Sequence, residues 1–139
     1  MLALSVRQPW AWAILHAGKR VENRVWALPQ QLIGHRILLH ASKGCTRYEY
    51  EDGADFIEAV SGLRPPPLDQ LPRGAIVGAF NLVGCVAPGE DGGDWHARDQ
   101  YGFQLDRVAA IAEPVPCSGL LGFWKAPPEV EAEIRRMVA

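Results

Sequence analysis

The segment that most constrains the fold is residues 75–86, AIVGAFNLVGCV, which contains no charged residue. An apolar run rich in branched and aromatic side chains is typical of a buried strand. Two glycines, Gly78 and Gly84, interrupt it. Because glycine inside a strand indicates a bulge or a sharp bend, the segment predicts a strongly curved sheet such as the wall of a small barrel.

The remaining segments indicate more strands than helices. Pro9 and Gly18 delimit a short segment that is apolar on all sides, which predicts a buried helix over residues 9–17. Strands are expected at residues 2–6, 20–26, 36–42 and within 101–117, and helices at residues 48–62 and from Pro127 onward. Helices do not alternate with strands, which excludes a doubly wound parallel sheet. We predict one α+β domain over residues 1–139, a small β-barrel with flanking helices.

The cysteine pattern limits the chemistry. The three cysteines, Cys45, Cys85 and Cys117, are far apart, odd in number and never spaced C-x-x-C. This excludes a disulfide framework and a structural zinc site, and we expect reduced thiols, no metal and no cofactor. The sequence contains neither a long apolar span nor a recognisable signal peptide, so we expect a cytoplasmic protein without a membrane partner.

Charge is distributed unevenly along the chain. Residues 1–47 contain seven Lys or Arg residues and one acid, a net charge of +6, whereas residues 48–139 contain seven bases and fifteen acids, a net charge of −8. Such asymmetry indicates a basic face for an anionic partner, unless the two parts interdigitate in space and their charges cancel.

Three charged residues follow the first predicted helix at the spacing K-x-x-E-x-R. Within RVENRVW, strict alternation places Val21 and Val25 on one strand face and Glu22 and Arg24 on the other, with Lys19 at the preceding turn. A carboxylate between two cations can orient a ligand or take part in proton transfer. The other interpretation is a solvated ion pair.

Four segments resemble the ASCH domain family of the PUA-like superfamily. They are SVRQPWAWAILHAGKRVENRVW, ILLHASK, PRGAIVGAFNL and EPVPCSGLLGFWKAP, which span about residues 2–127. The family pattern G-x-K-x-x-E-x-R falls on residues 17–24. Lys19, Glu22 and Arg24 match it, whereas Ala17 stands at the glycine position and Gly18 follows it.

The resemblance implies a small β-barrel with flanking helices, a cleft lined by the motif, and RNA or another nucleic acid as the ligand. Some relatives with this architecture are ribonucleases. A smaller branch removes an acetyl group from modified cytidine, with the motif lysine as a catalytic residue and threonine at the position of the motif glutamate. Here that position is Glu22, which argues against direct transfer of this chemistry.

Further candidate residues flank the motif. Arg7, Gln8 and Trp10 start the first predicted helix, where Arg7 suits a phosphate, Gln8 a base edge, and Trp10 either base stacking or core packing. His40 could act as an acid or base or serve a structural role, and Ser42 and Lys43 end the same strand. A Gly-rich acidic loop contains Asp94, Trp95, His96 and Asp99, which indicates either a metal site or a solvated, mobile loop.

These observations favour a nucleic-acid-binding domain that recognises single-stranded RNA or a nucleotide-sized ligand, such as a modified base, in a small basic cleft. The alternative is a small hydrolase, a ribonuclease or an amidohydrolase acting on acetylated cytidine, that uses Lys19 and Glu22 as catalytic residues. A third possibility is an interaction domain whose basic face contacts an acidic protein. The sequence gives no oligomeric state.

Overall fold

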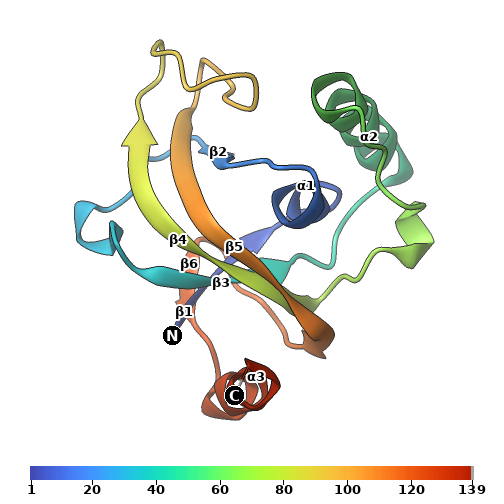
Figure 1. The fold of residues 1–139 in the computed structure, drawn as a ribbon, viewed down its shortest axis with the longest axis vertical. Helices are drawn as coiled ribbons and strands as arrows, with labels where there is room; N and C mark the ends of the chain where they lie inside the picture. Colours follow the sequence, from blue (N-terminus) through green and yellow to red (C-terminus); the bar gives the residue numbers. More distant parts are fainter. Residues whose placement is uncertain (139) are drawn as a thin grey trace.

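A computed structural model describes residues 1–138, and its elements follow the predicted order except for one further short strand, Phe123–Lys125, that the sequence analysis does not predict (Figure 1). The strands are β1 (Leu2–Val6), β2 (Val21–Arg24), β3 (Arg36–Ala41), β4 (Ala75–Val86), β5 (Tyr101–Pro116) and β6 (Phe123–Lys125). The helices are α1 (Trp10–His16), α2 (Arg47–Ser61) and α3 (Pro128–Val138), with short 3-10 turns at Gln30–Leu32 and Leu68–Gln70.

The six strands form one sheet in the order β2-β5-β4-β3-β1-β6, curled into a half-barrel. Only β1 and β3 are parallel, because α1 and β2 lie between them in the chain. The β4–β5 register shifts three times, once next to Gly78 and once next to Gly84. A Cβ at Gly78 would come within 2.7 Å of Leu15 on α1. Glycine therefore allows the strand to approach both α1 and the Ala109 carbonyl of β5. The register shifts beside Gly78 and Gly84 confirm the irregularities that the sequence predicts.

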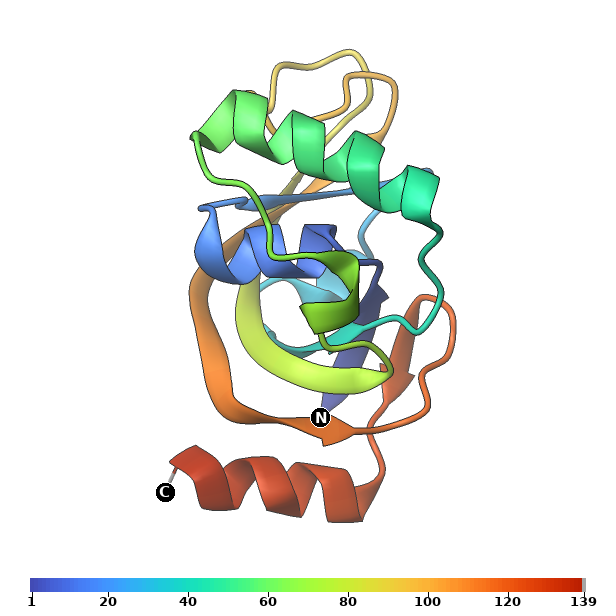
Figure 2. The same cartoon turned by 90° about the vertical axis from the view of Figure 1, so that its right-hand side faces the viewer.

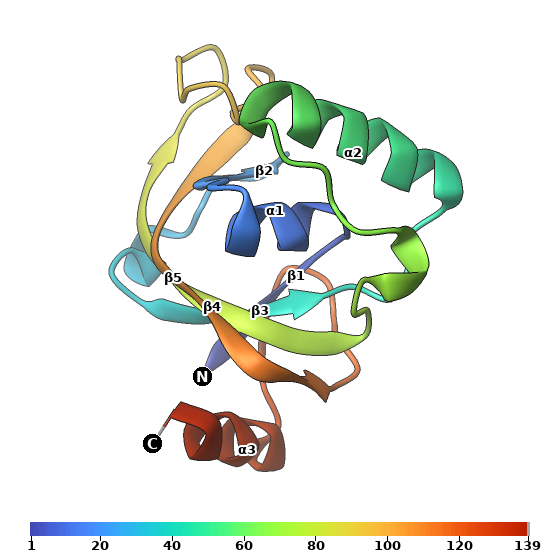
Figure 3. The ribbon, with the colours of Figure 1, turned by 45° about the vertical axis from the view of Figure 1, so that its right-hand side comes forward.

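Helix α1 lies inside the curve of the sheet (Figures 2 and 3). Ala11 and Ile14 pack there against the buried side chains of Phe80 and Phe103. Helix α3 covers the opposite face, where Val130 and Ile134 pack with Ile76 and Trp124. The amino terminus reaches Glu131 of α3 at 2.8 Å. The core thus has one layer on each face of the sheet, and a third, smaller cluster of Tyr50, Ala54 and Leu71 lies under α2.

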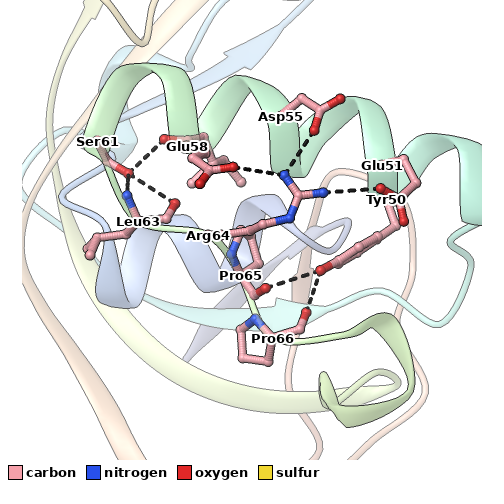
Figure 4. Close-up of polar contacts among 10 residues, drawn as sticks. Tyr50, Glu51, Asp55, Glu58, Ser61, Leu63, Arg64, Pro65 and Pro66 are labelled. Atoms are coloured by element: carbon pink, nitrogen blue, oxygen red, sulfur yellow. Dashed lines mark hydrogen bonds and ion pairs between the residues drawn. The ribbon is translucent and has the colours of Figure 1, made fainter.

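Helix α2 lies outside α1, and its position is fixed by the proline-rich segment that follows it (Figure 4). A capping box between Thr46 and Glu49 begins the helix, and Gly62 ends it in the left-handed conformation. The guanidinium of Arg64 turns back onto three carboxylates of α2, those of Glu51, Asp55 and Glu58. Tyr50 donates from its hydroxyl to the carbonyls of Pro65 and Pro66.

The structure differs from the sequence-based expectations in a few places. Helix α1 begins at Trp10, one residue after Pro9, and Gly18 is left-handed with φ of 75°, as expected. Strand β2 ends at Arg24, and Val25 is 80% exposed instead of sharing a buried face with Val21. The reason is that the pairing of β2 with β5 stops at Arg24, so the alternation of faces stops there as well. All three cysteines are free thiols. Within residues 1–138, none of the helices has the length and apolar character needed to cross a membrane.

Candidate nucleic-acid interface

The motif residues Lys19, Glu22 and Arg24 form a chain of charges, in which Lys19 and Glu22 are buried and Arg24 is partly buried. The Lys19 ammonium donates to Glu22 Oε1 at 3.2 Å and to the Val21 carbonyl at 2.5 Å. Arg24 donates from Nε to Glu22 Oε2 at 3.0 Å and from Nη2 to the Ser5 carbonyl at 2.6 Å. The side chains of Lys19 and Glu22 are only 3% and 9% exposed. The interpretation as a solvated ion pair is therefore wrong, because the turn after α1 folds Lys19 inward.

Local structure explains this inward turn. The amide of Lys19 donates to the Ala13 carbonyl, which ends α1 and brings the chain back along the helix. The ammonium then lies 5.7 Å from the centre of the Trp10 ring. Strand β2 follows at once and pairs with β5, which orients Glu22 and Arg24 toward the same region. The short K-x-x-E-x-R spacing thus becomes a compact site because a helix end and an edge strand meet there.

A cavity of about 470 Å³ opens beside this chain of charges, and we call it the aromatic pocket. Three rings line it, those of Trp10, Phe56 and Trp95. Trp10 and Phe56 lie edge to face with centroids 5.8 Å apart, and Phe56 and Trp95 do so at 6.1 Å. Its polar lining residues are Lys19, Glu22, Asn23, Asp52, Asp94, His96 and Gln100. Half-buried rings around a cavity of this size offer flat apolar faces to a small planar ligand.

Gly53 explains how α2 contributes to the pocket. A Cβ on this residue would lie 2.8 Å from Pro9 Cγ and 3.3 Å from the Trp10 ring. Only glycine therefore allows α2 to pack so closely on the start of α1. That close packing places Asp52 and Phe56, the neighbours of Gly53 on the helix, at the pocket. Gly53 lowers the helix propensity of α2, but it allows α2 to pack against α1.

The loop between β4 and β5 contributes Trp95, and two side chains hold it in place. Asn23 donates to the Trp95 carbonyl and accepts from the Ala97 amide, both at 2.9 Å. His96 is buried, accepts from the Gly92 amide at Nδ1, and lies 2.8 Å from the Gln100 carbonyl through Nε2. The centre of this loop is thus fixed against β2. Among the residues described, no three His, Cys, Asp or Glu side chains are grouped so that they could hold a metal ion.

A second depression, of about 800 Å³, lies where β1, β3 and β5 end, and we call it the basic groove. Its charged lining residues are Arg7, Lys43 and Arg73, and no carboxylate lines it. The two regions are joined by a smaller hollow lined by Arg7, Trp10, Glu22, Arg24 and Leu121, among others. Arg7 also contacts Glu49 at 2.9 Å, and the Thr46 amide and hydroxyl hold the pKa of Glu49 below its usual range. Lys43 and Arg73 are exposed and form no ion pair within residues 1–138.

His40 forms the floor of the basic groove and is held by a network. Trp124 donates to the Ser5 hydroxyl, which lies 3.0 Å from His40 Nδ1, and His40 Nε2 lies 2.7 Å from the Cys117 carbonyl. Because Nε2 faces a carbonyl, it carries the proton and Nδ1 accepts from Ser5. Burial lowers the pKa of His40, and the hydrogen bond to Cys117 opposes this shift only in part. The histidine is therefore a neutral structural group at pH 7.

The structure brings most of the candidate residues together. Lys19, Glu22 and Trp10 line the aromatic pocket, Arg24 lines the connecting hollow, and Arg7, His40, Ser42 and Lys43 line the basic groove. Gln8 is placed differently. It is 2% exposed, donates to the Pro72 carbonyl, and accepts from the Trp12 amide. Its amide group therefore joins two backbone segments instead of facing a ligand.

Several lining residues were missed by the sequence reasoning, namely Asn23, Asp52, Phe56, Arg73, Gln100 and Leu121. The loop with Asp94 and Trp95 was noticed, but only as a metal site or a solvated loop. The signal that was available is Gly53, because a glycine in the middle of an otherwise regular helix often has a packing reason. Acids of the later, acidic part of the chain thus reach the motif, so the two parts do interdigitate here.

The comparisons with known proteins agree with this architecture. A family model described as the ASCH domain matches residues 4–116. The chain belongs to the ASCH domain family. Its fold is that of the crystal structure of ASCH from Zymomonas mobilis, with a TM-score of 0.61 and 15% identity over 98% of this chain and 94% of that chain. No curated protein matches the chain significantly. The resemblance drawn from the four sequence segments is confirmed, and β6 and α3 follow the matched residues in the chain.

Proposed function

We propose that this ASCH domain binds single-stranded RNA or a nucleotide, with one base in the aromatic pocket and the phosphates along the basic groove. The ASCH domain is a PUA-like fold often linked to RNA binding. The observation that carries the proposal is the direct connection of the two regions through a hollow that Trp10 and Arg7 both line. Base stacking on aromatic rings and backbone contacts to cations are the two parts of single-strand recognition.

The size of the basic groove limits the expected electrostatic contribution. Lys43 and Arg73 form no ion pair among the described residues, whereas Arg7 also binds Glu49. The groove can therefore contact about two to three phosphates, and the logarithm of affinity should fall with the logarithm of salt concentration at a slope of about −1.4 to −2. A duplex is a poor fit because its bases are paired and cannot enter the pocket. This domain should therefore prefer a single strand or an unpaired base.

The test is fluorescence anisotropy with a short labelled single strand and with the same strand in a duplex. Wild type is compared with the pair Lys43→Gln and Arg73→Gln, and with the control pair Arg135→Gln and Arg136→Gln, which removes the same charge from α3 on the other side of the sheet. We expect weaker binding and a shallower salt slope only for the groove pair. Equal effects of the two pairs, or a salt-independent affinity, would contradict the proposal.

A hydrolase is the second candidate, because the pocket gathers Lys19 and Glu22 with two further carboxylates, Asp52 and Asp94. Incubation with short single-stranded RNA and with acetylated cytidine, followed by mass spectrometry, detects turnover. General acid–base catalysis contributes about 10²–10⁴-fold in rate. Turnover that disappears in Lys19→Ala while ligand affinity persists would replace the binding proposal by the hydrolase. Lack of turnover with intact binding supports the binding domain.

A further inference from the structure

We propose that the aromatic pocket selects a positively charged nucleobase, such as an N-alkylated purine, over its neutral counterpart. The inference rests on the proposed function and names the ligand class of the same site. Its starting point is the charge of the pocket lining. Three carboxylates, those of Glu22, Asp52 and Asp94, line the pocket with one cationic side chain, that of Lys19. Arg24 adds a second positive charge at Glu22 from the connecting hollow.

The ammonium group of Lys19 already has hydrogen-bond partners within the protein. Its ammonium lies buried against the Val21 carbonyl and the Glu22 carboxylate. Glu22 is in turn bonded to Arg24. These three charges are bonded to one another and sum to +1, so that with Asp52 and Asp94 the site carries a net charge of −1.

Asp52 and Asp94 are the two pocket carboxylates that take no part in this chain of charges. Within the described part of the chain, neither carboxylate has a hydrogen-bond or ion-pair partner in the protein, and both side chains are exposed at the pocket. They come from different elements, α2 and the loop between β4 and β5, which carry the Phe56 and Trp95 rings. Each free carboxylate therefore stands close in sequence to an aromatic wall of the pocket.

Aromatic rings combined with carboxylates favour a cation. The face of an aromatic ring attracts positive charge, and aromatic cages recognise permanently cationic groups in this way. A neutral base gains the stacking alone, and an anionic group is repelled by the two carboxylates. Phosphates of the bound strand would lie along the basic groove, which Arg7, Lys43 and Arg73 line. A cationic base joined to an anionic phosphate therefore matches the separation of charge along this surface.

The sharpest probe is a pair of isomers. 1-Methyladenosine monophosphate is protonated on its base at pH 7 and carries a positive charge there, whereas N6-methyladenosine monophosphate has the same heavy atoms and a neutral base. Titration of each against the wild-type chain, followed by tryptophan fluorescence, gives the ratio of the two affinities. We expect the cationic isomer to bind about tenfold more tightly, in line with the strength of cation–π and carboxylate contacts.

Variants assign the preference to the pocket. The pair Asp52→Asn and Asp94→Asn should reduce the ratio to near one. The control pair Asp99→Asn and Asp106→Asn removes the same charge from exposed acids that do not line the pocket, and it should preserve the wild-type ratio. A ratio that falls equally in both pairs would assign the effect to the overall charge of the protein and overturn the inference.

Failure of this inference is distinguishable from failure of the proposed function. Equal affinity for the two isomers, with RNA binding that still depends on Lys43 and Arg73, overturns the charge selectivity and leaves the binding domain intact. If neither nucleotides nor RNA bind, the proposed function itself fails. If a trimethyl-lysine peptide binds and RNA does not, the pocket belongs to a protein ligand and both proposals are wrong.

Discussion

The aromatic pocket and the basic groove adjoin, yet they are built in opposite ways. In the pocket, Lys19 and Glu22 are buried and paired, and the rings come from α1, α2 and the loop between β4 and β5. In the groove, Lys43 and Arg73 are exposed and free of ion pairs among the residues described. A charge that is paired within the protein fixes local structure, whereas an exposed, unpaired charge is available to a ligand. The two regions therefore suit shape recognition and phosphate attraction, respectively.

The largest effect is expected at Glu22, which lines both the pocket and the connecting hollow. Glu22→Gln leaves two cations without their buried partner, and removing one member of a buried pair costs about 3–5 kcal/mol of unfolding free energy. Lys19→Met should cost less, because Glu22 keeps its bond to Arg24. Urea denaturation of both variants measures the difference. Equal costs would mean that Glu22 does not serve both cations.

Trp95→Ala tests the pocket separately from the groove. Loss of one stacking ring should weaken single-strand binding by roughly 1–3 kcal/mol. The salt slope should stay as in wild type, because the groove cations remain. Tyr48→Ala is the control, since Tyr48 is an aromatic residue that is 79% exposed and lines none of the three regions. A change in the salt slope of Trp95→Ala would show that the two regions are not independent.

Gly53→Val tests how α2 is held against the pocket. The added side chain collides with Pro9 and Trp10, and overpacking of this kind costs about 1–3 kcal/mol of unfolding free energy. Ala59→Val places the same branched side chain on an exposed position of the same helix and should cost less. Thermal or urea unfolding compares the two variants. Because valine is a better helix former than glycine, propensity predicts no loss at position 53. A loss in Gly53→Val no larger than that in Ala59→Val would contradict the close packing.

Lys43 and Arg73 in the basic groove should determine how strongly the affinity for a single strand depends on salt concentration. Lys43→Gln and Arg73→Gln should each make the salt slope for a single strand shallower by about 0.7. Stability should change little, since both side chains are exposed and unpaired by carboxylates. Affinity measured at several salt concentrations gives the slope. An unchanged slope would remove the groove from the binding surface.

The smallest effect concerns the neutral His40 beneath the groove. Its pKa is lower in the folded chain because of burial, so below about pH 6.5 the unfolded chain binds a proton that the folded chain does not. Stability from this group is thus full above about pH 6.5 and falls as pH decreases toward the folded pKa. Unfolding of wild type and His40→Gln at neutral and mildly acidic pH should show a weaker pH dependence in the variant. His35→Gln, at an exposed histidine, is the control and should behave as wild type.

Much of the fold followed from patterns that are local in the sequence. The curved strand with Gly78 and Gly84, the short apolar helix before Gly18, and the K-x-x-E-x-R spacing each depend on neighbouring residues. Local geometry dictates strand curvature, helix ends and the face that Glu22 and Arg24 share. The four ordered segments also indicated the ASCH domain family, which the family match over residues 4–116 confirms.

Burial and the meeting of distant segments were decided only by the tertiary structure. Lys19 is buried because α1 lies inside the curve of the sheet, and no local pattern distinguishes that from a solvated ion pair. Asp52, Phe56 and Trp95 lie 28 or more residues from the motif in the sequence. The close packing at Gly53 and the hydrogen bonds from Asn23 to the loop bring them to it. Gln8 was predicted to contact a ligand, but its side-chain amide binds the backbone of Trp12 and Pro72. Pro72 is distant in the sequence, so no local pattern indicates this contact. Side-chain type sets what a residue can do, but its accessibility and its neighbours depend on contacts between segments far apart in the chain.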